Sequence, residues 1–164
     1  MGLNFVIMKC VWILVGKTTE RYLIDSVSIY TERISHYMTF ETMVIPELKN
    51  TKNISRELQK EREGIAILQL LVPTDELVLL DEKGKTYTSE GFAEWIDKKM
   101  NHSIKRLVFV VGGPYGFSDT VYARANHKLA LSHMTFSHQL IRLLFVEQFY
   151  RAMTILKGEP YHHG

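Results

Sequence analysis

The chain has 164 residues, of which 46% are hydrophobic and 23% charged, so it can bury one packed core and is not a disordered chain. The formal net charge is only +2, which neither requires nor excludes a nucleic-acid partner. The single cysteine, Cys10, excludes an intramolecular disulfide and favours a reducing compartment, which we take to be the cytoplasm. We expect one domain over residues 1–164, with residues 1–7 as a possible upstream extension before Met8.

The N-terminal half alternates between apolar and amphipathic stretches. Phe5–Val15 is apolar almost throughout, which predicts a strand buried on both faces, and it is too short to span a membrane. Thr19–Tyr37 has the spacing of an amphipathic helix, and Phe40–Ile45 predicts a second strand. Ile54–Leu71 predicts a helix. Its charged stretch RELQKERE is expected to face solvent, with an RNA contact as the minor alternative.

The C-terminal half continues the alternation. Thr88 and either Ser118 or Asp119 are expected to cap helices. The predicted elements, in chain order, are a strand at Leu77–Leu80, a turn at Asp81–Gly84, a helix at Ser89–Met100, a strand at Leu107–Val111, a helix from Asp119 to about Lys128, a short apolar stretch at Leu129–Ser132 and a long helix at His138–Leu156.

This alternation predicts the α/β class, with a parallel sheet covered by helices on both faces. The last helix, His138–Leu156, is apolar around most of its circumference. A surface helix needs one polar face, so this helix should be covered on two sides. A symmetric homodimer is the simplest source of that second cover in a small domain.

The stretch VFVVGGPYGFSD, residues 108–119, ends a buried strand on Gly112 and Gly113. It matches neither the dinucleotide fingerprint nor a phosphate-binding P-loop, so either a tight turn or a ligand explains the glycines. Two further strand-end segments, Leu80–Gly84 and Leu131–Phe136, are expected at the same edge of the sheet. Convergence of the three would form an apolar pocket with backbone polar groups, suited to an uncharged heterocycle.

Histidines 133, 138, 162 and 163 cluster in the last third, but no cysteine accompanies them and their spacing is not that of a zinc motif. We therefore expect no metal. Glu147 and Arg151 are four residues apart and can pair on the last helix. The polar residues of this helix either keep a dimer interface in register or, through Arg142 and Arg151, face an anionic substrate.

Five motifs, taken together and in order, resemble one family. They are LLDEKGK (79–85), TSEGFAEWI (88–96), VVGGPYGFS (110–118), LALSHMTFSHQLIRLLFVEQFYRAMTIL (129–156) and GEPYHH (158–163). In these motifs the chain resembles the ribosomal large subunit methyltransferase H family, the 23S rRNA pseudouridine N3-methyltransferases of the SPOUT class. The resemblance covers nearly the whole chain from about Met8 and is most specific in the C-terminal half.

The resemblance implies an α/β fold with a deep C-terminal trefoil knot, a homodimer, and S-adenosylmethionine as methyl donor. The chain departs from the family pattern at Ser137, at Ala130 and at the His163-Gly164 tail, and the role of this tail is therefore open. By position, the resemblance places the cofactor contacts at Leu80, Gly112, Leu131, Ser132, His133, Met134, Thr135 and Phe136.

The implied reaction transfers a methyl group to N3 of a pseudouridine, so the enzyme must mainly align donor and acceptor. The catalytic candidates are Arg142, Tyr150 and His162, and the substrate-binding candidates are His138, Arg151 and Tyr161. A general base is open among His138, Glu147 and His162. The low net charge favours rRNA within the assembled ribosome as the substrate. The alternative function is a non-catalytic dimeric module that binds a nucleotide or RNA.

Overall fold

The computed structural model describes residues 7–164, in which strands and helices alternate along the chain. The elements are β1 (Lys9–Val15), α1 (Arg21–Ser35), β2 (Phe40–Ile45), the short 3-10 helix η1 (Thr51–Asn53), α2 (Arg56–Gln69), β3 (Glu76–Lys85), α3 (Ser89–Met100), β4 (Arg106–Val111), α4 (Asp119–Arg124), β5 (His127–Leu129) and α5 (Leu140–Leu156).

A single five-stranded sheet has the order β2-β1-β4-β3-β5, and every pairing in it is parallel. The central strand β4 is apolar from Leu107 to Val111, and none of these residues is more than 2% exposed. Parallel strands require crossover helices on the sheet faces, which is why a central strand is apolar on both sides. The predicted α/β class with a parallel sheet is confirmed.

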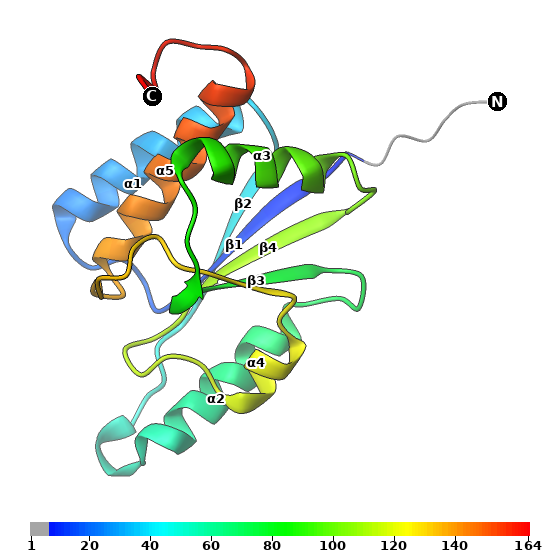
Figure 1. Ribbon diagram of the computed structural model, residues 1–164. Helices are drawn as coiled ribbons and strands as arrows, with labels where there is room; N and C mark the ends of the chain where they lie inside the picture. The colour runs from blue at the N-terminus through cyan, green and yellow to red at the C-terminus, as the bar shows by residue number, and fades with distance from the viewer. Residues whose placement is uncertain (1–6) are drawn as a thin grey trace.

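Helices cover both faces of the sheet (Figure 1): α1, α3 and α5 lie on one face, and α2 and α4 lie on the other. Alternate residues of β4 serve the two layers. Phe109 packs in the core beneath α1, α3 and α5, whereas Val108 and Val110 pack in the core beneath α2 and α4. The helices pack on the two faces of the sheet, so the carboxyl ends of the parallel strands all point to one end of the sheet.

Strand β3 is longer than predicted and bends around β5. The segment predicted as a turn, Asp81–Gly84, lies inside β3, and Leu80 and Lys85 both pair with Leu129 across an irregularity. A Cβ on Gly84 would lie only 2.6 to 2.7 Å from backbone atoms of Lys128 and Leu129. β3 therefore bends closely around β5, and only glycine allows this approach of two backbones.

The helix predicted to reach Lys128 ends at Arg124, and residues 127–129 form β5 instead. Asn126 starts the new strand, because its backbone N–H donates to Leu77 O at 2.9 Å and its Oδ1 accepts from Leu77 N at 2.8 Å. The backbone of β3 offers hydrogen bonds that local helix propensity cannot match. The helical pattern therefore covers only the six residues of α4, and the pairing with β3 decides the structure of residues 127–129.

Among the described residues, β1 begins at Lys9, so Ile7 and Met8, which were predicted to lie in the first strand, precede it. Phe5 and Val6, and nearly all of the possible extension at residues 1–7, lie outside the described residues. The predicted caps are confirmed: Thr88 Oγ1 accepts from Gly91 N at 3.0 Å, and Ser118 Oγ accepts from Val121 N at 3.3 Å. The C-terminal knot stays a prediction.

Candidate functional site

A cavity of about 790 Å³ opens at the carboxyl ends of β3, β4 and β5, and we call it the strand-end cavity. Three separate segments of the chain form most of it, as the sequence predicted. Its lining residues are Leu80 to Lys83, Val111 to Phe117, Leu129 to Ser132, Met134 to His138, Ile141, Tyr122 and, from the first two turns of α2, Arg56, Glu57 and Lys60.

All the predicted cofactor residues except one line this cavity. The exception is His133, which is exposed and does not line it. The side chain of its neighbour Ser132 folds back locally, where Oγ accepts from Met134 N at 3.0 Å. The remaining predicted contacts, which do line the cavity, are Leu80, Gly112, Leu131, Ser132, Met134, Thr135 and Phe136.

The glycine loop, Gly112–Ser118, forms one wall of the strand-end cavity. Gly116 N donates to Gly113 O at 3.3 Å, and Gly116 adopts a φ of +82° that suits glycine. A Cβ on Gly112 would lie 3.0 Å from the ring of Phe117. A side chain at residue 112 would therefore press on the Phe117 ring, and both residues line the cavity.

The rim of the cavity combines cations, aromatic rings and carboxylates. The Arg56 guanidinium lies 4.9 Å from the ring centre of Tyr115, which is 42% exposed. Lys128 lies 5.7 Å from the ring centre of Tyr122. The Tyr122 hydroxyl donates to Asp81, whose proximity helps burial to raise the tyrosine pKa. This rim was not predicted from the sequence, because its residues come from separate segments and no single motif contains them.

His138 lies two residues before α5 and Arg142 lies in its first turn, and the two side chains have different surroundings. His138 lines the cavity, and burial together with the Arg142 charge lowers its pKa, so its imidazole is neutral at neutral pH. Arg142 has no exposed surface, and burial lowers its pKa to about 10. Its guanidinium donates to the carbonyls of Val15, Gly16 and His138 and to Thr18 Oγ1, at 2.9 to 3.0 Å.

Arg142 thus ties the end of β1 to the start of α5. The sequence analysis considered that this side chain faces an anionic substrate. Four of the five guanidinium donors are bonded to internal acceptors and the side chain has no exposed surface, so a phosphate cannot reach it in this conformation. The geometry therefore favours a structural role for Arg142 over the predicted substrate contact.

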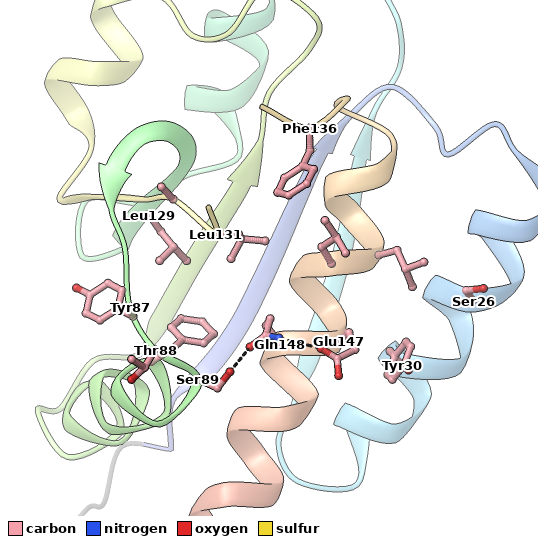
Figure 2. Close-up of a pocket in the computed structure, with 14 residues that line it drawn as sticks. Ser26, Tyr30, Tyr87, Thr88, Ser89, Leu129, Leu131, Phe136, Glu147 and Gln148 are labelled. Carbon is pink, nitrogen blue, oxygen red and sulfur yellow. Dashed lines mark hydrogen bonds between the residues drawn. The ribbon is translucent and has the colours of Figure 1, made fainter. Parts of the chain in front are cut away.

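A second hollow of about 580 Å³, the helix-face groove, lies between α1, α3 and α5. Figure 2 shows Leu131 and Phe136 reaching into it from the segment after β5, opposite Tyr30 of α1. Ser89 Oγ donates to Gln148 Oε1 at 2.9 Å at its edge. Leu131 and Phe136 also line the strand-end cavity, so the two hollows share a wall.

The tail cluster comprises Glu147, Tyr150, Arg151, Tyr161 and His162, which the C-terminal turn brings onto α5. Glu147 Oε1 accepts from Arg151 Nη2 at 2.5 Å and from the Tyr161 hydroxyl at 3.0 Å. Arg151 also lies 4.7 Å from the Tyr161 ring centre and within 3.1 Å of His162 Nδ1. The predicted pairing of Glu147 with Arg151 is confirmed.

Burial, the hydrogen bond shared with the Tyr30 hydroxyl and the hydrogen bond that Tyr161 donates to Glu147 raise the pKa of Tyr161, so this phenol stays protonated. Tyr150 packs beside it, with ring centres 4.7 Å apart. His162 Nε2 contacts Glu90 Oε1 at 2.7 Å, which ties the tail to α3. None of these residues lines the strand-end cavity of the same chain, so His138 is the one predicted catalytic or substrate residue that lies with the cofactor residues, and the tail cluster forms a separate group.

Within residues 7–164, no group of three or more histidine, cysteine, aspartate or glutamate side chains is arranged to hold a metal ion. No helix in this part of the chain is both long and apolar enough to cross a membrane.

Comparison with known proteins identifies the family. Residues 8–162 match the family model described as "Predicted SPOUT methyltransferase". The chain is 58% identical over 156 residues to the ribosomal RNA large subunit methyltransferase H of Parabacteroides distasonis, covering 95% of this chain and 99% of the relative. It is 55% identical over 151 residues to the protein of the same name from Flavobacterium johnsoniae, covering 92% and 96%. The chain therefore belongs to the SPOUT methyltransferase family.

Proposed function

We propose that this protein transfers a methyl group from S-adenosylmethionine to N3 of a pseudouridine in 23S rRNA. One observation carries the proposal: three strand-end segments converge on one cavity in a chain of the SPOUT methyltransferase family. Relatives at 54–58% identity are named for rRNA methylation, which favours this function over a non-catalytic binding module. The site of action would be the cytoplasm, where ribosomes are.

The residues of the strand-end cavity fit S-adenosylmethionine. Leu80, Leu131 and Phe136 offer apolar walls for an adenine ring, and Gly112 and Gly113 line the cavity without side chains that would fill it. When bound, the cofactor would supply a methyl group that its sulfonium makes electrophilic. The protein would then mainly orient the two reactants, which is worth about 7–11 kcal/mol in favourable cases.

The pseudouridine N3 must lose its proton during transfer. Among the predicted base candidates, only His138 lines the strand-end cavity. Its lowered pKa keeps it neutral and able to accept a proton, so we propose it as the base. Glu147 and His162 are engaged with Arg151 in the tail cluster instead.

A homodimer would join the two separate groups of residues. The helix-face groove is apolar, and Leu143 and Leu144 line it while only half-buried. A second copy seated there would cover the apolar side of α5, as its sequence requires. The tail cluster of the partner could then face the strand-end cavity, so that a complete site needs two chains.

The rim of the strand-end cavity suits a nucleic-acid strand. Arg56 and Lys128 can contact phosphates, and the exposed faces of Tyr115 and Tyr122 can stack on bases. With a net charge of only +2, few such contacts are available to one chain. The substrate is therefore proposed to be rRNA within the assembled ribosome rather than free RNA.

A ligand screen tests the cofactor directly. S-adenosylmethionine and S-adenosylhomocysteine should each raise the unfolding temperature of the purified protein, because both would bind only the folded state. ATP and NAD should leave it unchanged. Stabilisation by ATP or NAD alone would instead favour the nucleotide-binding module.

Replacing Tyr161 by phenylalanine should slow methylation of ribosomes about 10-fold while the affinity for S-adenosylmethionine stays the same. The variant loses the hydroxyl that bonds Glu147 at 3.0 Å, and one such bond to a charged group is worth about 1.5 kcal/mol or more. Tyr22→Phe is a matched control, since Tyr22 is 62% exposed on α1. Equal turnover in Tyr161→Phe and the control would exclude a substrate role for this hydroxyl.

A further inference from the structure

Glu63 is a buried carboxylate that the proposed reaction does not use. It lies on the inner face of α2 with only 6% of its surface exposed. Its Oε2 accepts a long hydrogen bond from Gln59 Nε2 at 3.4 Å, and its buried Oε1 has no hydrogen-bond partner among the described residues. An apolar side chain of similar size would fill this position at lower free energy, so packing alone does not explain a glutamate here.

The carboxylate of Glu63 lies directly against the glycine loop. A Cβ on Gly113 would be 2.8 Å from both of its oxygens. The next residue of α2 contacts the other end of the same loop, since a Cβ on Gly64 would lie 2.5 Å from Ser118 Oγ. Residues 63 and 64 therefore contact the loop near both of its ends, and neither lines the strand-end cavity.

We propose that Glu63 is a positioning residue, whose carboxylate fixes the glycine loop in the shape that binds the methyl donor. This inference rests on the proposed function. Gly113 lines the cavity on one side and contacts Glu63 on the other, so the carboxylate acts on the ligand through a single backbone unit. Its negative charge also lies behind the wall that would face a positively charged sulfonium cofactor.

The surroundings of Glu63 make this effect depend on pH. Burial raises its pKa, the Gln59 hydrogen bond opposes that rise, and the nearby Glu47 charge adds to it. The glycine loop and α4 present uncharged groups to residues 63 and 64, namely Gly113, Ser118 and Val121. A cationic ligand beyond Gly113 favours the ionised carboxylate, so the ligand should bind more weakly at pH values low enough to protonate Glu63.

The Glu63 charge is expected to favour ligand binding but to lower the stability of the fold. A carboxyl whose folded pKa lies above its unfolded value destabilises the fold at pH values above that pKa. Glu63→Gln removes this penalty and should unfold at the same or a higher temperature at neutral pH. A variant that becomes more stable and yet binds the donor less tightly is the signature of a positioning role, which a packing residue would not give.

The test compares Glu63→Gln with Glu61→Gln, a control at an exposed position of the same helix. We expect Glu63→Gln to show about 10-fold faster amide exchange in residues 112–118, about 10-fold weaker S-adenosylmethionine binding at pH 8, and a smaller loss of affinity than the wild type as the pH falls from about 8 to about 5. Glu61→Gln should match the wild type in all three measurements.

Unchanged loop exchange together with an unchanged pH profile in Glu63→Gln would overturn the inference. If the wild type itself does not bind S-adenosylmethionine at any pH, the proposed function fails, while the exchange rates still decide whether Glu63 fixes the loop. Should Glu63→Gln not fold, Gly113→Ala disturbs the same contact from the loop side. It should give the same faster exchange, and normal exchange in that variant would equally overturn the inference.

Discussion

Replacing Arg142 by methionine is expected to lower the unfolding temperature by roughly 10 °C, the largest stability effect that we predict for a single substitution. The change leaves the carbonyls of Val15, Gly16 and His138 without their buried donor. Each unsatisfied group costs about 1–3 kcal/mol, and 1 kcal/mol corresponds to about 2–4 °C in a domain of this size. Differential scanning calorimetry measures the shift.

Two further variants serve as controls for the stability of Arg142→Met. Arg21→Met removes an arginine whose side chain is 87% exposed and should change the unfolding temperature little. Arg142→Lys keeps the charge but not the planar fork of donors, so it should recover only part of the lost stability. An Arg142→Met protein with wild-type stability and no methylation would restore the substrate contact that the sequence suggested.

Replacing Gly112 by valine is expected to weaken S-adenosylmethionine binding by roughly 100-fold or more. The new Cβ would lie 3.0 and 3.1 Å from two ring atoms of Phe117 and 3.5 Å from Gly116 O. The extra methyl groups must displace either the ring beneath the glycine loop or the ligand above it. Overpacking of this kind costs about 1–3 kcal/mol, and the blocked cavity adds to that loss. Isothermal titration calorimetry measures the affinity.

Gly91→Ala is the control for Gly112→Val, because its added methyl group makes a comparably tight contact, 3.1 Å from Thr88 Oγ1, at a residue that does not line the strand-end cavity. It lies within α3, where alanine is favoured over glycine, and should leave cofactor affinity unchanged. An unaltered affinity in Gly112→Val would mean that the strand-end cavity does not bind the cofactor beside this loop.

Much of the fold follows from local pattern. The continuous apolar run of Leu107–Val111 predicts a central parallel strand, and Thr88 and Ser118 mark helix starts through their own hydroxyls. β5 could not be predicted, because residues 127–129 become a strand only through the backbone of β3. The bend of β3 around Leu129 depends in the same way on a contact between distant segments.

The candidate site likewise contains parts that the sequence predicts and parts that only contacts between distant segments create. The glycine loop is visible in the sequence because its residues are consecutive, whereas the rim pair of Arg56 and Tyr115 joins two elements far apart in the chain. Glu63 was interpreted as part of a solvated charge run, although it lies four residues before the buried Ile67 and therefore on the same helix face. That spacing was the signal for its burial, and the charge of its neighbours masked it.

The most direct test of the proposed function uses ribosomes from cells that lack this gene. The purified protein is incubated with their large subunits and S-adenosylmethionine carrying a deuterated methyl group, and the nucleosides of 23S rRNA are analysed by mass spectrometry. We predict one labelled methyl group at N3 of a pseudouridine, formed by the wild type and lost in Gly112→Val. Labelled ribosomes without N3-methylpseudouridine, or no label at all with a wild-type protein that binds the donor, would contradict the proposed reaction.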